Sequence, residues 1–173
     1  AYTTHIPALE ARGIKVEYDM PEGVVLFKDA NLEKAIRGAL EIPTELLKKE
    51  DLAGLKELVV DGGIPWHSDS LTEQEQIKDL VGLEHCTGLT QLNLRNHQIN
   101  DISALGNLTK LSNIELSFNQ LSDISPLSNL INLTNLILWG NKKISDISPL
   151  SNLASLTQLN LWQNKISDIN PLA

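Results

Sequence analysis

Residues 111–132 read LSNIELSFNQLSDISPLSNLIN, and this pattern of leucine and isoleucine recurs on both sides of the stretch. Four copies begin at Leu89, Leu111, Leu133 and Leu156, so the chain repeats itself at intervals of 22, 22 and 23 residues. A period of this length is typical of solenoid proteins, in which each repeat buries its apolar face against its neighbours. The pattern therefore predicts a stack of repeats with an extended open surface, which suits binding better than catalysis.

Each repeat has two halves that differ in the spacing of their apolar residues. The first half, L-x-x-L-x-L, alternates apolar and other residues as a strand does. The second half, I-x-D-I-x-P-L-x-x-L, spaces them three apart, which suits a 3₁₀ or short helical turn on the convex side. Ser125-Pro126 and Ser148-Pro149 are expected to supply an N-cap and a first-turn proline. We expect an α/β solenoid with five short parallel strands in one curved sheet, at residues 57–60, 91–94, 113–116, 135–138 and 158–161.

The first repeat is interrupted by extra residues. Apolar positions at 55–60 lie 34 residues before their counterparts in the second repeat, whereas those at 77–86 lie only 22 residues before theirs. The difference predicts a 12-residue insertion, which enlarges the loop at 61–76. Cys86 falls where later repeats have leucine, so we expect it to be a small buried hydrophobe rather than a reactive thiol.

A different pattern precedes the repeats. Asn31 is expected to cap a helix that ends at Pro43, and Thr44 to Leu52 is expected to form a second short helical piece. Together they form a predicted N-terminal cap at 23–54, which covers the open apolar end of the first repeat. Residues 1–22 suggest a helical turn, a strand and a linker. The chain stops in mid-repeat, so we expect 55–173 to be a C-terminally truncated array from a longer protein.

Composition excludes several classes of function. The net charge is −8 and no run of Lys or Arg forms a stripe, so nucleic acid is not an expected partner. No apolar stretch approaches the roughly 18 residues of a membrane span, so membrane insertion is not expected. We find no nucleophile, phosphate-loop or metal motif, and predict neither an enzyme nor a cofactor. The insertion contains Trp66, His67, Asp69 and Glu73, but the other histidines are distant in sequence, which favours surface decoration over a metal site.

The units resemble bacterial 22-residue leucine-rich repeats of the internalin type, with the pattern L-x-x-L-x-L-x-x-N-x-I-x-D-I-x-x-L-x-x-L-x-x over residues 55–173. FKDANLEKAIRGAL at 27–40 and LKKEDLAGLKEL at 47–58 resemble the helical cap found ahead of such repeats in secreted or surface-attached bacterial proteins. THIPALEARGIKVEYD at 4–19 resembles the flank that closes a preceding array. The resemblance implies a bacterial, extracellular or cell-surface protein that recognises a partner across its concave sheet.

Two polar columns run through the repeats. The family's asparagine column comprises Asn119, Asn141 and Asn164, with His97 in its place in the second repeat, and we expect it to bond backbone groups of adjacent turns. The aspartate column comprises Asp79, Asp101, Asp123, Asp146 and Asp168. Stacked carboxylates could gather calcium ligands. Capping of the helical turns that follow is the favoured role for these aspartates. Two further departures are Ala104 in the proline column and one extra residue at Lys142-Lys143.

The strand positions between the inward leucines should face the concave side. They form four columns: Gln91, Asn113, Asn135 and Gln158; Asn93, Glu115, Ile137 and Asn160; Arg95, Ser117, Trp139 and Trp162; Asn96, Phe118, Gly140 and Gln163. Neighbouring strands lie about 4.8 Å apart, so two of the chain's three tryptophans should be neighbours on a solvated face. Trp139, Trp162, Ile137 and Phe118 are the candidate anchors. Arg95 and Glu115 are candidates for specificity, and Asn135 and Gln158 for hydrogen bonds to a peptide or glycan.

Other interpretations of these columns stay open. The indoles could stack only on each other, or be covered by another protomer or by downstream repeats, and the amide column could be inert polar surface. The favoured hypothesis is a non-catalytic module that binds a protein or glycan on its concave face. The alternative is a structural spacer or scaffold of a larger surface protein, with head-to-tail contacts through residues 1–22.

Overall fold

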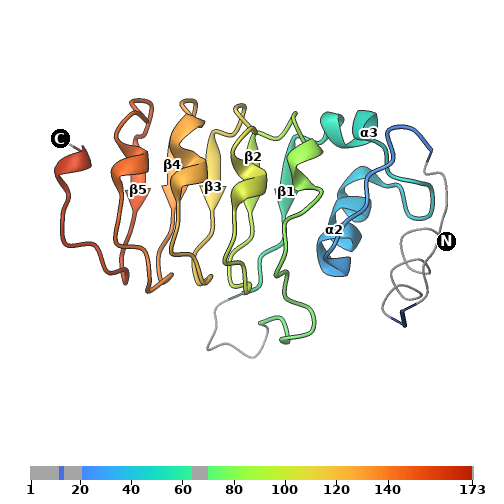
Figure 1. Cartoon of the computed structure of the whole chain (residues 1–173), viewed down its shortest axis with the longest axis horizontal. Coiled ribbons are helices and arrows are strands. Elements are labelled where there is room, and N and C mark those ends of the chain that lie inside the picture. Colours follow the sequence, from blue (N-terminus) through green and yellow to red (C-terminus); the bar gives the residue numbers. More distant parts are fainter. Residues whose placement is uncertain (1–11, 14–20, 64–69, 173) are drawn as a thin grey trace.

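The computed structural model describes residues 12–13, 21–63 and 70–172, which form a row of stacked turns (Figure 1). Two helices, α2 (Ala30–Leu40) and α3 (Lys49–Gly54), stand at one end of the row. The strands are β1 (Glu57–Val59), β2 (Gln91–Asn93), β3 (Asn113–Glu115), β4 (Asn135–Ile137) and β5 (Gln158–Asn160). Short 3₁₀ turns occupy Leu83–His85, Ser103–Leu105, Ser125–Asn129, Ser148–Leu150 and Asn170–Leu172.

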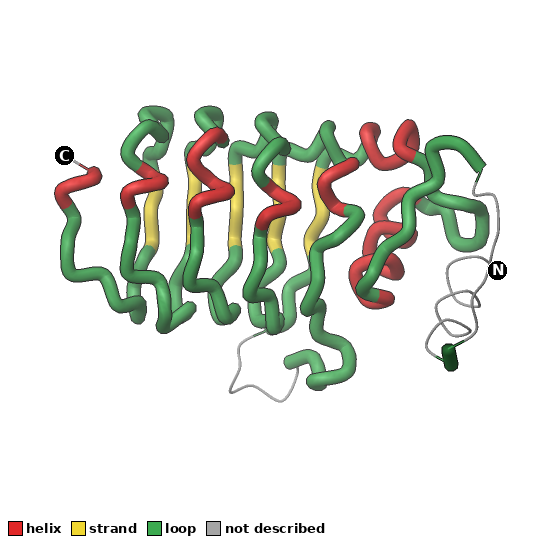
Figure 2. The backbone as a smooth tube through the Cα atoms, viewed as in Figure 1, coloured by secondary structure: helices red, strands yellow, loops and turns green. Residues whose placement is uncertain are grey.

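The strands pair in chain order and all run parallel, in one open sheet. Figure 2 shows the strands on one face of the stack and the 3₁₀ turns on the other. This arrangement confirms the predicted leucine-rich repeat solenoid. Each strand ends one residue earlier than predicted, although the ladder of backbone bonds continues past that point. For example, the Leu94 amide donates to the Glu115 carbonyl at 2.9 Å.

The core lies between the sheet and the turns, and the repeat pattern fills it with leucine and isoleucine. The middle residue of each strand points inward, and the register aligns these residues in one buried row: Leu58, Leu92, Ile114, Leu136 and Leu159. The row is fully buried except at Leu159, which is half-buried in the last strand. Cys86 is buried in the same core, at the leucine position that its repeat lacks.

Asp29, and not Asn31, caps helix α2, which corrects the sequence-based prediction. One carboxylate oxygen of Asp29 accepts from the amides of Asn31 and Leu32 at 2.9 and 3.1 Å. Its other oxygen accepts from the amides of Lys78 and Asp79 at 2.7 and 3.3 Å, so the cap residue also ties the helix to the first repeat. Asn31 lies inside the helix, and its side-chain amide donates to the Gln74 and Gln76 carbonyls at the far end of the insertion.

The second helix begins five residues later than predicted, at Lys49 rather than Thr44. Leu47 and Lys48, just before it, are paired with another segment: Val24 forms an antiparallel bridge with Lys48, and the Val25 amide donates to the Leu47 carbonyl. A chain paired in this way cannot be helical, so α3 starts where the pairing stops. The first helix ends at Leu40, three residues before the predicted Pro43, and Glu41 follows in the left-handed region at φ 58°.

The 3₁₀ turns are capped by aspartate and not by serine. Ser125 and Ser148 are the first residues of their turns, and their amides donate to Asp123 and Asp146, both at 2.8 Å. Serine was predicted as the cap because it precedes proline, but the residue two positions earlier has the geometry to accept. The same bond recurs at the other aspartates of the column: Asp79, Asp101 and Asp168.

Candidate interaction surface

Four side chains form a continuous stack across the second to fifth repeats, which we call the aromatic ladder: Arg95, Phe118, Trp139 and Trp162. The Arg95 guanidinium lies 5.6 Å from the centre of the Phe118 ring. Phe118 contacts Trp139 in a tilted arrangement, with ring centres 4.5 Å apart, and Trp139 stacks on Trp162 at 5.3 Å. Parallel pairing in constant register aligns Arg95, Trp139 and Trp162, which lie just beyond the ends of their strands, whereas Phe118 lies one position further along.

Phe118 enters the ladder from an unexpected backbone position. The fourth predicted column does not belong to the strands: its residues lie in left-handed turns, with φ of 55°, 56°, 76° and 55° at Asn96, Phe118, Gly140 and Gln163. Asn96 is 6% exposed and donates to the Gly62 carbonyl at 2.7 Å, so it is not on the open face. The prediction that Asn96 faces the concave side is therefore wrong, because strand alternation ends before this column, whereas Phe118 joins the stack on the open side.

Gly140 provides the space that the Phe118 ring occupies. A Cβ at Gly140 would lie 2.7 Å from a ring carbon of Phe118, which is closer than carbon atoms can pack. The left-handed backbone at Gly140 also favours glycine. Ser117, the member of the third column in this repeat, is only 1% exposed, so Phe118 and not Ser117 contributes to the stack.

Within the ladder, Trp162 is exposed, whereas Arg95, Phe118 and Trp139 are half-buried. Trp139 is half-buried between its two aromatic neighbours, and its indole N–H has no hydrogen-bond partner within the described residues. Trp162 is 64% exposed, although tryptophan has the largest side chain of all residues and most of its surface is apolar. An indole left in water on a flat stack resembles the apolar anchors of binding surfaces more than a core residue.

The second column has a role in ending the strands that the sequence did not suggest. Its polar members each accept from the amide two residues later: Asn93 from Arg95 at 3.1 Å, and Glu115 from Ser117 at 2.8 Å. Asn160 makes the same bond to Trp162 at 3.1 Å. One oxygen of the Glu115 carboxylate is therefore already engaged by its own strand end. The polar residue at the end of three of the strands, Asn93, Glu115 and Asn160, is the signal that could have revealed this.

The amide column lies beside the ladder and is half-buried, apart from the more exposed Gln158. Gln91 donates to the Glu57 carboxylate at 2.8 Å, which links the first two strands. Asn113 donates to the Ser112 hydroxyl at 3.3 Å. The side-chain oxygen of Asn135 has no hydrogen-bond partner within the described residues. Ile137 lies in this region as the only apolar member of the second column.

A shallow hollow of about 370 Å³ adjoins the ladder at the strand ends, with Phe118, Gln120 and two lysines in its wall. Lys142 and Lys143 include the extra residue of the fourth repeat, and Lys142 lies in the left-handed region at φ 64°. Lys165 follows in the next turn, where its amide donates to the Ile144 carbonyl. All three lysines are exposed, and none takes part in the ion pairs found among the described residues. A chain of net charge −8 thus has a cationic edge beside its aromatic stack.

The asparagine column lies under this surface and ties each turn to the one before it. Asn119 accepts from the Ile99 amide at 3.1 Å and donates to the Leu94 and Leu116 carbonyls at 2.8 and 3.1 Å. Asn141 repeats the pattern one turn later, with Leu121, Leu116 and Leu138 as partners. Asn164 makes only the donor bonds, to Leu138 and Leu161 at 2.9 Å each. These bonds position the strand ends on which the ladder is built.

The other candidate residues do not form a site in the described part of the chain. Burial raises the pKa of Cys86 to about 12, so its thiol stays protonated. No three His, Cys, Asp or Glu side chains converge as metal ligands within residues 12–13, 21–63 and 70–172. In the insertion, Trp66, His67 and Asp69 lie outside the described residues, and Glu73 is an exposed residue 3.9 Å from Lys78. Most of the predicted flank at 1–22 also lies outside them.

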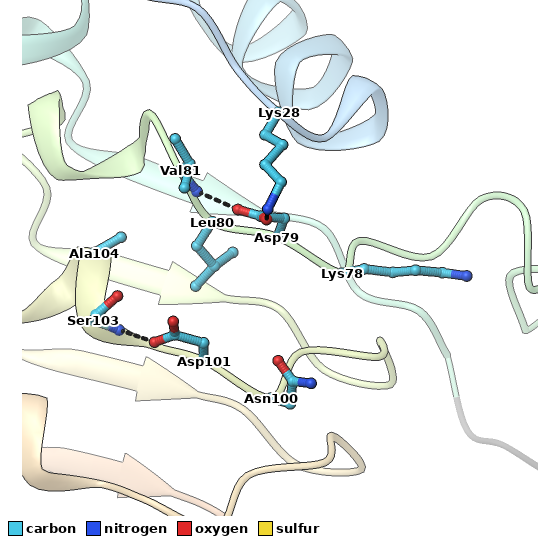
Figure 3. A pocket seen from close by; sticks show the side chains of 9 residues that line it. All are labelled: Lys28, Lys78, Asp79, Leu80, Val81, Asn100, Asp101, Ser103 and Ala104. Atoms are coloured by element: carbon cyan, nitrogen blue, oxygen red, sulfur yellow. Dashed lines mark hydrogen bonds and ion pairs between the residues drawn. The ribbon is translucent and has the colours of Figure 1, made fainter. Parts of the chain in front are cut away.

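A second hollow lies on the side of the 3₁₀ turns, next to the first two aspartates of the column (Figure 3). Asp79 forms an ion pair with Lys28 at 2.5 Å and accepts from the Val81 amide, while Asp101 accepts from the Ser103 amide. The Lys28 ammonium lowers the pKa of Asp79. These bonds engage both carboxylates locally, which fits capping better than the gathering of a cation.

Comparisons with known proteins agree with this architecture. A family profile described as "Leucine Rich repeats (2 copies)" matches residues 109–152 and 131–173. No curated protein sequence matches the chain. Among the described residues, no helix is both long and apolar enough to span a membrane.

Two solved structures show where the similarity lies. The structure of an internalin (inlF) from Listeria monocytogenes str. 4b F2365 is 39% identical with a TM-score of 0.74, and the match covers 84% of this chain and 40% of that one. A leucine-rich repeat protein of Leptospira interrogans is 24% identical with a TM-score of 0.54, covering 66% of this chain and 27% of that one, and shares the fold. This chain thus spans well under half the length of either protein. The repeat pattern, the parallel sheet in constant register and the match to the Listeria protein show that the chain is a leucine-rich repeat protein of the internalin type.

Proposed function

We propose that this chain is a non-catalytic recognition module that binds a protein partner on the concave face of its sheet, outside the bacterial cell. The observation that carries the proposal is the aromatic ladder, with Trp162 64% exposed at its end. Only 4% of the residues are aromatic, yet three of them stack on the open side of the sheet. Leucine-rich repeat proteins of the internalin type are protein-interaction modules, which supports the same conclusion.

The dimensions of the ladder suit the surface of another protein. Its four side chains come from successive strands about 4.8 Å apart, so the stack extends over about 14 Å. Four residues of extended chain, or one face of a short loop, cover that distance. Tryptophan at the centre of an interface commonly contributes about 2 kcal/mol or more to affinity, and neighbouring polar side chains exclude water around it.

The charges around the ladder indicate what the partner presents. Arg95 lies at one end of the stack, the exposed Lys142 and Lys143 line the hollow beside Phe118, and the exposed Lys165 lies in the next turn. A partner with carboxylates beside an apolar side chain would complement both features, and opposite charges would speed its association. Glu115 is available for specificity only through its second carboxylate oxygen, since the first accepts from its own strand.

A glycan is the other partner that this face could accept. Sugars stack on indoles and bond to amides, and Asn135 and Gln158 lie on the strands that lead to Trp139 and Trp162. The two partners differ in their response to salt. Binding of an acidic protein would weaken as ionic strength rises, because the lysines are exposed and screened, whereas binding of a neutral glycan would change little.

Substitution of the exposed indole tests the proposal directly. The chain is immobilised and offered an array of extracellular proteins and glycans, and the affinity of every captured partner is then measured by titration. Trp162→Ala should weaken binding by about 30-fold or more, since 1.4 kcal/mol is about tenfold. Circular dichroism should show an unchanged fold, because Trp162 contributes little to the core. Ile131→Ala, which removes another apolar residue that is 57% exposed, is the matched control. Full affinity in Trp162→Ala would end the proposal.

A structural role is the second candidate, and one observation favours it. The last described turns leave apolar side chains uncovered, with Ile169 71% and Leu172 44% exposed beside a hollow lined by Leu153, Leu156 and Leu159. A second copy could cover this end and build head-to-tail contacts through its residues 1–22. Light scattering over a range of concentrations tests this role. A monomer at the highest concentration would exclude it, and growth of larger species abolished by Leu172→Asp would support it.

A further inference from the structure

His97 occupies the place of the column asparagine in the second repeat and makes the same two kinds of hydrogen bond. Its Nδ1 lies 3.1 Å from the Ile77 amide nitrogen, and its Nε2 lies 2.8 Å from the Val60 carbonyl oxygen. In the next repeat, Asn119 accepts from Ile99 at 3.1 Å and donates to Leu94 at 2.8 Å. The imidazole is only 3% exposed, so water does not replace a bond that is lost there.

The two bonds require one protonation state of the ring. A backbone amide can only donate and a carbonyl can only accept, so Nδ1 must carry no proton and Nε2 must carry one. A second proton on the ring would place Nδ1–H against the Ile77 N–H, and that bond would be lost. The asparagine amides in the other repeats do not titrate at all. The chain thus has a titratable group at one of its turn-to-turn junctions, where its other repeats have a neutral amide.

The two hydrogen bonds of His97 link the first repeat to the second. Val60 precedes the insertion at 61–76 and Ile77 follows it, so a single ring joins both of its ends to the second repeat. Other side chains also hold the two ends: Asp61 accepts from the Gly63 amide and Asp29 from the Lys78 amide, and neutral amides make further bonds. Asn96 donates to the Gly62 carbonyl at 2.7 Å, and Asn31 donates to the carbonyls of Gln74 and Gln76 at 2.8 and 3.2 Å.

We propose that His97 is an acid-sensitive latch: when the ring takes up a second proton, the Ile77 amide loses its acceptor in the second repeat, and the backbone bond from the Gln98 amide to the Ile77 carbonyl is left to hold this point. The asparagine-linked junctions between the later repeats stay closed under the same conditions. The result is a chain whose N-terminal repeat loosens in mildly acidic surroundings while the remainder of the array keeps its structure. This inference stands apart from partner binding, since none of its bonds involves Phe118, Trp139 or Trp162.

The electrostatic surroundings give the direction of the effect. Burial lowers the pKa of His97 from its ordinary value of 6.5, and this outweighs the Val60 carbonyl and the carboxylates of Asp29 and Asp61, which raise it. Asp29 faces the ring from the start of α2, and Asp61 from the segment after β1. With the pKa lower in the closed state than in the open one, the open state binds more protons as pH falls. Closure is therefore complete above pH 6.5 and weakens below it.

Hydrogen exchange at single amides tests the latch. The Ile77 amide is followed by nuclear magnetic resonance at pH 7.5, 6.5 and 5.5, and each rate is divided by its intrinsic rate at that pH. Protection of Ile77 should fall by up to about tenfold per pH unit below pH 6.5, as linkage requires. The Leu121 amide is the control within the same molecule, because it donates to Asn141 at 3.0 Å and should keep its protection.

His97→Asn is the matched variant, because it restores the amide that the other repeats use. It should fold and should hold the protection of Ile77 constant over the same pH range, whereas His97→Ala should lower it at every pH. The remaining three histidines stay in place in His97→Asn, so they serve as controls for any general effect of acid. An unchanged pH dependence in His97→Asn would overturn the proposal. A nitrogen spectrum of the wild type with the proton on Nδ1 at pH 7.5 would do the same, even if the variant does not fold.

Discussion

Replacement of Asn141 by alanine tests how the repeats are held together. The side chain is 2% exposed and makes three bonds: it accepts from the Leu121 amide at 3.0 Å and donates to the Leu116 and Leu138 carbonyls at 3.1 and 2.9 Å. The three backbone groups bonded to Asn141 do not all lose their only side-chain partner in the variant. Leu116 keeps a bond from Asn119, and Leu138 keeps one from Asn164, whereas the Leu121 amide loses its side-chain acceptor.

The magnitude follows from this difference. A buried donor left without a partner costs about 1–3 kcal/mol, and each bond lost from a carbonyl that retains another costs about 0.5–1.5 kcal/mol. We therefore expect Asn141→Ala to lower the free energy of unfolding by about 4 kcal/mol. Asn164→Ala is the control, because its oxygen has no partner within the described residues and its surroundings are partly exposed. That variant should lose only about 1 kcal/mol.

Equilibrium unfolding in urea measures both variants. Far-ultraviolet circular dichroism and tryptophan fluorescence should be recorded together, because coincident transitions establish that the array unfolds in one step. If the transitions separate, the stability of each part of the array is fitted with a nearest-neighbour repeat scheme. Equal losses for Asn141→Ala and Asn164→Ala, or a loss below about 1 kcal/mol for Asn141→Ala, would refute the reasoning that bonds between turns carry this stability.

Three further predictions test other parts of the structure. Gly140→Ala should lower the free energy of unfolding, measured by thermal unfolding, by about 1–3 kcal/mol, because the new Cβ would lie 2.7 Å from the Phe118 ring. Gly38→Ala is the control and should not destabilise the chain, because the space around Gly38 is open. Cys86, with its pKa raised to about 12, should resist iodoacetamide at pH 8 until denaturant is added, as mass spectrometry would show. Asp29→Ala should lower the free energy of unfolding in urea by about 2–4 kcal/mol, because four backbone amides lose their acceptor. Asp101→Ala removes the acceptor of one amide only, so it should lower the same free energy by about 1 kcal/mol.

Much of the fold followed from the spacing of apolar residues. The interval between Leu89, Leu111, Leu133 and Leu156 predicts one turn of the stack per copy, and the observed strands pair in that register. The interval also predicts that Trp139 and Trp162 are neighbours, and they stack at 5.3 Å. Such inferences succeed because a repeat converts positions in sequence into positions in space. Whether these residues bind a partner stays a prediction.

Non-periodic features were harder to predict. The cap of α2 was assigned to Asn31, but Asp29 is held there because it also accepts from two amides of the first repeat, 49 and 50 residues away in sequence. The start of α3 was placed at Thr44, but pairing of residues 47–48 with 23–25 keeps that segment extended. Neither contact can be predicted from the neighbouring residues, because the partner lies elsewhere in the sequence.

By itself, the sequence determined the solenoid, the direction in which its leucines point, and the column in which each polar residue lies, because a regular period leaves one way to bury every apolar face. The tertiary structure decided which members of a column remain open to solvent. Phe118 lies in a left-handed turn with its ring against Gly140, so it joins the aromatic stack in place of the buried Ser117. It also decided that His97 bonds to both ends of the insertion. These outcomes depend on packing between turns, where backbone geometry and neighbouring side chains act together.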